Sequence, residues 1–286
     1  MTILVTGARG AIARSLIEQL LTAGHKVRAA GREPAAARLP AGVDVMEADL
    51  ARPETLGAAL AGATKVFVYA EPTGLDGFVA EARAAGVEHI VLLSALGAEP
   101  GSADRIPRIH GDAEQAVAGS GIPWTFLRPG GFATNALQWA GSVRAEGTVC
   151  DPFPESHAAP VHEADIAAVA ARVLTDPGTE HLGAVHVLTG PGSLTRREQA
   201  EQIGAAIGRP VRIVRQSLDD HRAELAQWGP PDVAEALIRT AEEAVGRPAE
   251  TTGTVQEITG RPPRSFAEWA ADHAADFTAD FTAPES

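Results

Sequence analysis

The sequence predicts an α/β fold, a doubly wound parallel sheet with a smaller C-terminal substrate domain. Short β-branched runs alternate with Ala/Leu-rich helical stretches as far as about residue 130. These runs are apolar at consecutive positions, which is typical of parallel strands covered on both faces. A glycine-containing turn follows the first run, as in folds that bind a ligand at a strand end. The 286 residues, 45% of them hydrophobic, suffice for a large domain with a smaller partner.

Seven apolar runs are the predicted strands. They are rich in Val, Ile, Leu and Phe, and most are followed closely by Gly, Pro or an acidic residue. The predicted strands cover residues 3–7, 26–32, 43–50, 65–70, 89–95, 124–130 and 183–190.

Helical periodicity occupies the segments between these strands. The first helix, AIARSLIEQLLTAG, places Ile12, Leu16 and Leu20 on one face and stops at Gly24. The same pattern predicts shorter helices in RPETLGAALAG, GLDGFVAEARAAG and HGDAEQAVAGSG.

After Gly130 the chain becomes rich in Gly, Pro and small residues. A helix follows in EADIAAVAARVL, with Asp165 placed to cap its start. The segment TRREQAEQIGAAIG opens with a Thr195-x-x-Glu198 capping box and stops at Gly208. One short strand, PVRIVRQ, and further helices complete the chain, and the tail TADFTAPES is expected to fray.

The composition excludes several function classes. A net charge of -13 without a block of basic residues disfavours nucleic acid and anionic membranes. No run approaches the ~18 apolar residues of a membrane span. The start of the chain lacks a signal-peptide pattern and Cys150 is the only cysteine, so we expect a cytoplasmic protein without an intramolecular disulfide. None of the nine histidines has a zinc-ligand spacing, so no metal site is expected.

The segment TGARGAIA, residues 6–13, carries the glycines of a phosphate-binding turn. Gly7 permits the sharp turn, and Gly10 lets the backbone approach a pyrophosphate at the helix N-terminus. Ala13 takes the third position, where only a small side chain is needed. In this strand-turn-helix context the motif predicts a dinucleotide site, which also includes Ala11 and Ile12.

The residues after the second strand favour NADP over NAD. An NAD site would place an acid there to bind the ribose, whereas Arg32 stands near that position and Arg9 lies in the glycine loop. Two guanidinium groups suit a 2′-phosphate, but Glu33 could reach the ribose and keeps NAD as the alternative. Asp49 either accepts a hydrogen bond from the adenine amine or caps a turn. Further predicted cofactor contacts stand at strand ends: Leu50, Ala70, Ser94, Pro129 and Gly130.

Five segments carry a family resemblance: ILVTGARGAIARSLIEQLLTAGHKVRAAGRE, WTFLRPGGFATNAL, EADIAAVAARVL, VLTGPGSLTRREQAEQIGAAIGRPV and ITGRPPRSFAEWAADHAADF. They resemble the NmrA-like family, atypical members of the short-chain dehydrogenase/reductase superfamily. The resemblance implies an NAD(P)-binding Rossmann domain, residues 1–130 plus about 160–190. It also implies a smaller substrate-binding domain, about 131–159 plus 191–280. The family includes NADPH-dependent quinone and azo-compound reductases, and also non-catalytic redox sensors.

The catalytic set that the wider superfamily implies is incomplete in this chain. Typical members use Ser, Tyr and Lys, with Tyr-x-x-x-Lys on the helix after the fifth strand. Ser94 stands at the serine-like place, but the only tyrosine, Tyr69, lies in the fourth predicted strand. His110 and Glu114 occupy the region of the Tyr/Lys pair, and Glu114 has the wrong charge to replace lysine. They are either a catalytic acid with its orienting carboxylate or residues with a structural or ribose-contacting role.

The predicted function is NADP(H)-dependent hydride transfer to a quinone-like or other conjugated small molecule. Such an acceptor becomes a delocalised anion and needs little help from a general acid. Pro129 and Gly130 line the nicotinamide or form a plain turn, and Phe132 and Asn135 face the substrate or only pack. The alternative is a non-catalytic NAD(P)-sensing regulator that acts through a protein partner. A homodimer is compatible with either function.

Overall fold

The computed structural model describes residues 1–36, 39–71, 73, 75–227 and 230–278. The chain forms two compact units. Unit 1 comprises Met1–Pro129, Glu163–Leu188 and Gly253–Pro262. Unit 2 comprises Gly130–His162, Thr189–Thr252 and the chain from Pro263 onwards. Most of the tail that we expected to fray, residues 279–286, lies outside the described residues.

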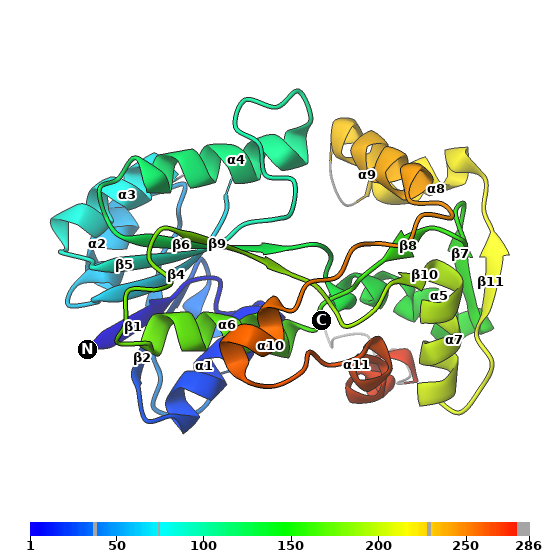
Figure 1. Cartoon of the computed structure of the whole chain (residues 1–286), viewed down its shortest axis with the longest axis horizontal. Helices are drawn as coiled ribbons and strands as arrows, with labels where there is room; N and C mark the ends of the chain where they lie inside the picture. Colours follow the sequence, from blue (N-terminus) through cyan, green and yellow to red (C-terminus); the bar gives the residue numbers. More distant parts are fainter. Residues whose placement is uncertain (37–38, 72, 74, 228–229, 279–286) are drawn as a thin grey trace. The chain divides into compact units, whose positions relative to one another are not determined.

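Unit 1 is built on a seven-stranded parallel sheet in the order β3-β2-β1-β4-β5-β6-β9 (Figure 1). The strands are β1 (Thr2–Val5), β2 (Lys26–Gly31), β3 (Asp44–Glu47), β4 (Lys65–Tyr69), β5 (His89–Leu93), β6 (Trp124–Pro129) and β9 (Ala184–Leu188). The strand order reverses between β1 and β4, and doubly wound sheets bind ligands outside the carboxyl ends at such a point. The predicted α/β fold with a doubly wound parallel sheet is confirmed.

Helices cover both faces of this sheet. On one face α1 (Ala11–Thr22) packs against α6 (Glu163–Thr175). On the other face α3 (Leu75–Ala84) lies between α2 (Leu56–Leu60) and α4 (Arg105–Ala118). Because the helices lie on the two faces, loops rather than helices border the carboxyl ends of the strands.

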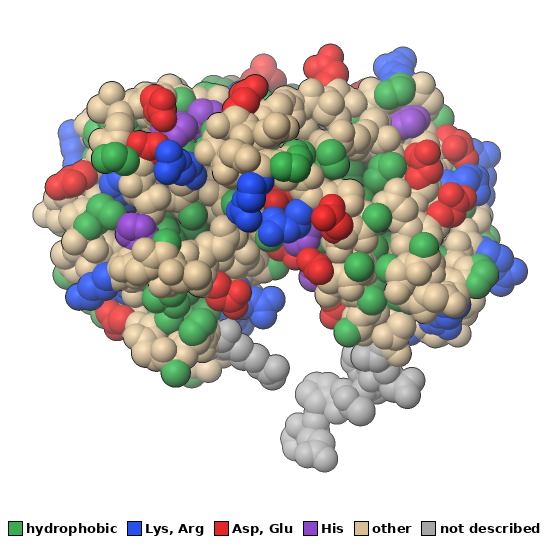
Figure 2. All heavy atoms as spheres, turned by 60° about the horizontal axis from the view of Figure 1, so that its bottom comes forward, with side chains coloured by type: hydrophobic (Ala, Val, Ile, Leu, Met, Phe, Trp, Pro, Cys, Tyr) green, Lys and Arg blue, Asp and Glu red, His purple; other side chains and the backbone are tan. Residues whose placement is uncertain are grey.

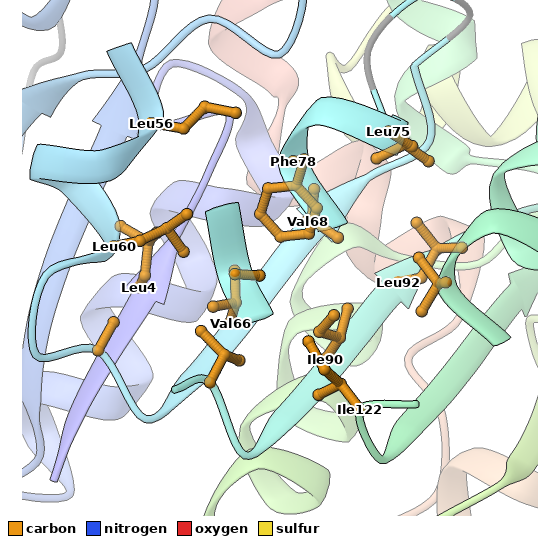
Figure 3. Packing of buried hydrophobic residues seen from close by; sticks show 14 of the residues in the cluster. Leu4, Leu56, Leu60, Val66, Val68, Leu75, Phe78, Ile90, Leu92 and Ile122 are labelled. Atoms are coloured by element: carbon orange, nitrogen blue, oxygen red, sulfur yellow. The ribbon is translucent and has the colours of Figure 1, made fainter. Parts of the chain in front are cut away.

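The core of unit 1 explains the continuous apolar runs. Strand and helix side chains interdigitate under α2, α3 and α4 (Figure 3); they include Leu4, Val66, Val68, Ile90 and Leu92 from strands, and Leu56, Leu60, Leu75 and Phe78 from helices. The neighbouring strand residues Val5, Phe67 and Val91 are fully buried and, because side chains alternate along a strand, point to the opposite face. The inner strands are therefore apolar at consecutive positions.

Two helix starts differ from the prediction. Helix α4 begins at Arg105, five residues before the predicted start, because Pro107 is tolerated in a first helical turn. His110 and Glu114 consequently lie in the middle of a helix. Helix α6 begins at Glu163, so the prediction that Asp165 caps it is wrong: Asp165 lies inside the first turn and is 3% exposed.

A third difference concerns the segment Gly253–Pro262, which we expected in the smaller domain. It belongs to unit 1, where its helix α10 (Thr254–Thr259) packs against α6 and β9. Val255 is almost completely buried there. The helix has only six residues, too few for helical periodicity to reveal its buried face.

Unit 2 contains short strands and helices around a separate core. Strand β7 (Thr148–Asp151) pairs in parallel with β11 (Arg212–Arg215), and β8 (His157–Ala158) pairs antiparallel with β10 (Leu194–Thr195). The sequence predicted only β11. The helical segments are η3 (Ala133–Trp139), α5 (Ala140–Glu146), α7 (Arg196–Ala206), α8 (Leu218–Leu225), α9 (Pro231–Glu243), α11 (Phe266–Asp272) and η4 (Ala274–Phe277). The predicted capping box of Thr195 and Glu198 is confirmed at the start of α7.

The surface carries charges of both signs. On the face drawn in Figure 2, acidic and basic side chains are intermixed, with no extended basic patch. Among the described residues, no helix has the length and apolar character needed to cross a bilayer.

Candidate active site

The glycine loop between β1 and α1 has the backbone of a phosphate-binding turn. Gly7 has a φ of +66°, which favours glycine, and its carbonyl accepts the Gly10 amide at 2.8 Å. Gly10 precedes α1 without a capping side chain, and the first turn of α1 contains no acidic residue. The free amides there, including those of Ala11 and Ile12, are available to an anion and lie at the positive end of the helix.

Tyr69, for which no role was predicted from sequence, packs against this loop from the end of β4. A Cβ atom on Gly7 would lie 2.6 Å from Tyr69 Cε2, and one on Gly10 would lie 3.2 Å from the Tyr69 hydroxyl. Burial raises the pKa of Tyr69 to about 12, opposed by a backbone contact with Ala13. The ring thus makes glycine necessary at residue 7. The signal available in the sequence was the position of Tyr69 on β4, the neighbour of β1 where the strand order reverses.

The two arginines predicted to bind the 2′-phosphate differ in their surroundings. Arg9 forms an exposed ion pair with Glu33, with 2.5 Å between Nη1 and Oε2. Arg32 is exposed and has no hydrogen-bond or ion-pair partner among the described residues. The Ala8 amide donates to the Ala30 carbonyl at 3.1 Å, which fixes the glycine loop beside the end of β2. Glu33, the residue that left NAD as the alternative cofactor, is therefore already paired with Arg9.

Asp49 caps the turn after β3. Its Oδ1 accepts the Ala51 amide at 3.0 Å, and its Oδ2 accepts Arg52 Nε at 3.2 Å. The Ala51 amide, then Arg52, and more weakly the charge of Arg32, lower the pKa of Asp49. Of the two roles considered for Asp49, an adenine contact and a turn cap, its contacts in the structure are those of a turn cap. Leu50 follows it and packs against the core, and the Ala70 amide continues the β4 ladder by donating to the Leu93 carbonyl at 3.1 Å.

Ser94, Glu114 and Arg128 form a cluster at the ends of β5 and β6, in which Ser94 and Glu114 are buried and Arg128 is partly buried. Ser94 is completely buried, and its Oγ donates to Glu114 Oε1 at 2.5 Å. Arg128 Nε donates to the same oxygen at 2.8 Å, while Arg128 Nη2 binds Oε2. The hydrogen bond with Glu114 raises the pKa of Arg128. Glu114 thus anchors α4 to two strands, and it is Arg128 that balances its charge.

His110 lies one helical turn before Glu114 and is partly buried. Its Nδ1 is buried and has no hydrogen-bond partner in the part of the chain that the structure describes. Burial lowers the pKa of His110, and the charge of Glu114 opposes that effect only in part. His110 is therefore neutral at pH 7. No hydrogen bond joins it to Glu114 within the described part of the chain, because the Glu114 carboxylate is directed to Ser94 and Arg128.

The segment after β6 carries the remaining predicted residues. Pro129 ends β6, and its carbonyl accepts the Leu96 amide at 2.9 Å. In unit 2, which begins at Gly130, Phe132 forms a parallel bridge with Val161. The Asn135 residue is exposed, and its backbone amide donates to the Phe132 carbonyl at 3.1 Å.

One side-chain group could hold a cation, although no metal site was expected from sequence. Ligand atoms of Asp176, Glu180 and His181 lie within 4.8 Å of one another in the described residues. Asp176 Oδ1 accepts the Gly178 amide at 2.8 Å, and this bond is the main cause of the lowered pKa of Asp176. The contacts of Asp176 are those of a turn after α6.

A family comparison agrees with the geometry of the glycine loop. A family model described as NAD(P)H-binding matches residues 7–177. The chain belongs to this NAD(P)H-binding family. The resemblance to NmrA-like, atypical short-chain dehydrogenases is thereby confirmed. The uncapped amides of α1 and the unpaired Arg32 fit a dinucleotide carrying a 2′-phosphate.

Relatives of known activity are similar over nearly the whole chain. A (4-alkanoyl-5-oxo-2,5-dihydrofuran-3-yl)methyl phosphate reductase from Streptomyces griseus is 41% identical, covering 95% of this chain and 97% of the relative. An NAD(P)H azoreductase from Xenophilus azovorans is 38% identical, with the same coverage of both chains. The solved NADPH complex of a quinone oxidoreductase from Escherichia coli has a TM-score of 0.77 at 27% identity, covering 94% of this chain and 99% of that chain. This chain is an NAD(P)H-dependent oxidoreductase.

Proposed function

We propose that the protein transfers a hydride from NADPH to a conjugated small molecule, a quinone or an unsaturated carbonyl compound. The observation that carries this proposal is the Ser94–Glu114 hydrogen bond. It engages the hydroxyl that a ketone reductase would use, and the only tyrosine packs against the glycine loop. A ketone would leave a strongly basic alkoxide without a proton donor, whereas a conjugated acceptor leaves a delocalised anion that water can protonate.

Each part of the site has a separate role in this proposal. The amides at the start of α1 hold the pyrophosphate, and Arg32, assisted by Arg9, holds the 2′-phosphate. NADPH, when bound, supplies the hydride. Pro129 and Gly130 border the nicotinamide, while Phe132 and Asn135 face the acceptor. Neutral His110 is not an obligatory acid, so the acceptor takes up its proton from water.

The relatives support this acceptor class by their names. An azo compound, a quinone and an unsaturated furanone share one property, a π-system that delocalises the charge of an added hydride. We therefore expect steady NADPH oxidation with a quinone and with an unsaturated furanone, and little with a simple aliphatic ketone. Nicotinamide absorbance, combined with chromatographic identification of the reduced product, measures this directly.

The missing Tyr/Lys pair is compatible with the sequence-based alternative, a dinucleotide sensor without turnover, but the reductase relatives speak against it. It predicts tight NADPH binding without oxidation by any quinone, azo compound or furanone, together with capture of a protein partner that depends on the bound dinucleotide.

A cytoplasmic location and a homodimer are further parts of the proposal. Cell fractionation and light scattering test these two points.

A further inference from the structure

Arg196, the first residue of α7, carries a positive charge that forms no ion pair with any described residue. The side chain is partly buried, yet it has no hydrogen-bond or ion-pair partner among the described residues. Arg197, the next residue, is exposed and binds Glu155 at 2.7 Å. The partly buried guanidinium loses some of its hydration without gaining an ion pair, and its nitrogens still reach solvent, so an anion can approach them.

The position of Arg196 is fixed from two sides. Its amide donates to the Ser156 carbonyl at 3.1 Å, and the capping box of Thr195 and Glu198 starts the helix at this residue. The guanidinium carbon lies 5.8 Å from the centre of the Trp139 ring, which is itself buried. Stacking on an aromatic ring orients the planar group and leaves its N–H edges available.

The negative charge of Asp151 acts on Arg196, but Asp151 does not form an ion pair with the guanidinium. Asp151 Oδ1 instead accepts the Phe153 amide at 2.7 Å. Burial lowers the pKa of Arg196, and Asp151 acts in the opposite direction. Because arginine stays protonated at any physiological pH, the group remains a preorganised cation.

We propose that Arg196, stacked on Trp139, binds an anionic substituent of the substrate, in the first instance a phosphate ester. Trp139 ends η3, the segment that begins shortly after Gly130, so the anion site and the predicted acceptor-facing residues Phe132 and Asn135 belong to one stretch of unit 2. The inference deepens the proposed function and rests on it: the acceptor is a conjugated compound that also carries a negative charge. The relative from Streptomyces griseus is named for such a substrate, a furanone with a phosphate.

Binding to the NADP⁺ complex tests the inference without any turnover. Calorimetry compares two probes, an unsaturated furanone carrying a methyl phosphate and the same furanone carrying a free hydroxymethyl group. We expect the wild type to bind the phosphate about 10-fold to 100-fold more tightly, since a hydrogen bond between charged groups has that effect. Arg196→Gln should remove this preference, Arg196→Lys should keep part of it because it retains the charge, and Arg197→Gln should keep all of it.

Equal binding of both probes by the wild type would overturn the inference, and so would an Arg196→Gln protein that still prefers the phosphate. If Arg196→Gln does not fold, the Arg196→Lys protein and the salt dependence of phosphate binding by the wild type decide the question. Turnover is measured separately with NADPH. Absence of turnover with both probes contradicts the proposed function, while a phosphate preference that depends on Arg196 supports the anion site whatever the turnover.

Discussion

The carboxylate of Glu114 holds the hydroxyl of Ser94, with 2.5 Å between Ser94 Oγ and Glu114 Oε1. Arg128, which is partly exposed, shares the same carboxylate, so three side chains from α4 and two strand ends form one connected unit. In the site that we propose, this unit supports the loops that carry the cofactor and does not exchange protons with the substrate.

Replacement of Ser94 should therefore affect stability more than catalysis. Ser94→Ala removes a buried hydrogen bond to a charged group, which costs about 1.5–3 kcal/mol of unfolding free energy. We expect kcat for quinone reduction to fall less than about tenfold, because the hydroxyl is already engaged by Glu114. Chemical denaturation and steady-state kinetics give the two values. A loss of kcat of about 10²-fold at unchanged stability would instead place Ser94 in the reaction.

His110 provides a prediction about pH. Burial lowers its pKa below 6.5, so the neutral form prevails above pH 6.5 and the rate should be flat between about pH 6.5 and 8. His110→Ala should lower kcat by less than about tenfold. Gln115→Ala, on the exposed side of the same helix, is the matched control. If the imidazolium were the proton donor, the wild-type rate would rise as pH falls below 6.5, and the alanine variant would lose both that rise and ~10²-fold in rate.

The exposed pair of Arg9 and Glu33 makes cofactor choice adjustable. Glu33→Gln removes a negative charge and frees Arg9, so NADPH should bind more tightly, by roughly tenfold or less because the site is exposed to salt. Arg32→Ala should weaken NADPH by about 10-fold to 100-fold and leave NADH nearly unchanged. Calorimetric titration of each variant with both cofactors measures these effects, and Arg83→Ala, on α3, is the control. Equal losses for NADPH and NADH would exclude a 2′-phosphate contact for Arg32.

The glycine loop can be tested together with Tyr69. Gly10→Val should abolish dinucleotide binding in a folded protein, because the β-branched side chain occupies the space of the pyrophosphate. Gly10→Ala is a milder change whose Cβ meets the Tyr69 hydroxyl at 3.2 Å. The double variant Gly10→Ala/Tyr69→Phe should therefore regain part of the NADPH affinity that Gly10→Ala loses. NADPH affinity that Tyr69→Phe does not alter in either background would mean that the Tyr69 hydroxyl does not constrain residue 10.

His89 makes the folded state sensitive to acid. Burial, and then the charges of Lys65 and His181, lower its pKa to about 4. Between pH 6.5 and 4, His89 is protonated in the unfolded chain but stays neutral in the folded one. The unfolding free energy therefore falls as the pH falls through this range, on the order of 3 kcal/mol in total. Above pH 6.5 His89 does not change the unfolding free energy. Urea denaturation of His89→Gln should show a shallower pH dependence over this window than the wild type or His25→Gln. An unchanged slope would mean that His89 titrates normally.

The parts of the fold that follow from local patterns were predicted from sequence. All seven strands of the main sheet and the capping box at Thr195 were predicted, because burial on both faces and reciprocal capping leave clear signals. Strands β7, β8 and β10 were missed. Their two to four residues are too few for a periodic pattern, and pairing with distant segments stabilises them.

In the candidate site, too, some features were predictable from sequence and others were not. Gly7, Gly10 and Arg32 could be selected because the chemistry of a phosphate site prescribes their residue types and spacing. The contacts of Glu114 could not, since nothing local indicates that Arg128, on the next strand, would take up its charge. The packing of Tyr69 on the glycine loop and the unpaired charge of Arg196 likewise depend on residues distant in the sequence.

Helix α10 affects how the protein can be made in the cell. It is encoded near the end of the chain, yet it covers part of α6 in the unit that begins at Met1. Domains usually fold in order as they leave the ribosome, at about 5–20 residues per second. Here the first unit must wait until most of the second has been synthesised before its last helix is available. Premature termination anywhere before Gly253 would thus leave both units unfinished, and neither unit can be produced by itself by shortening the gene from one end.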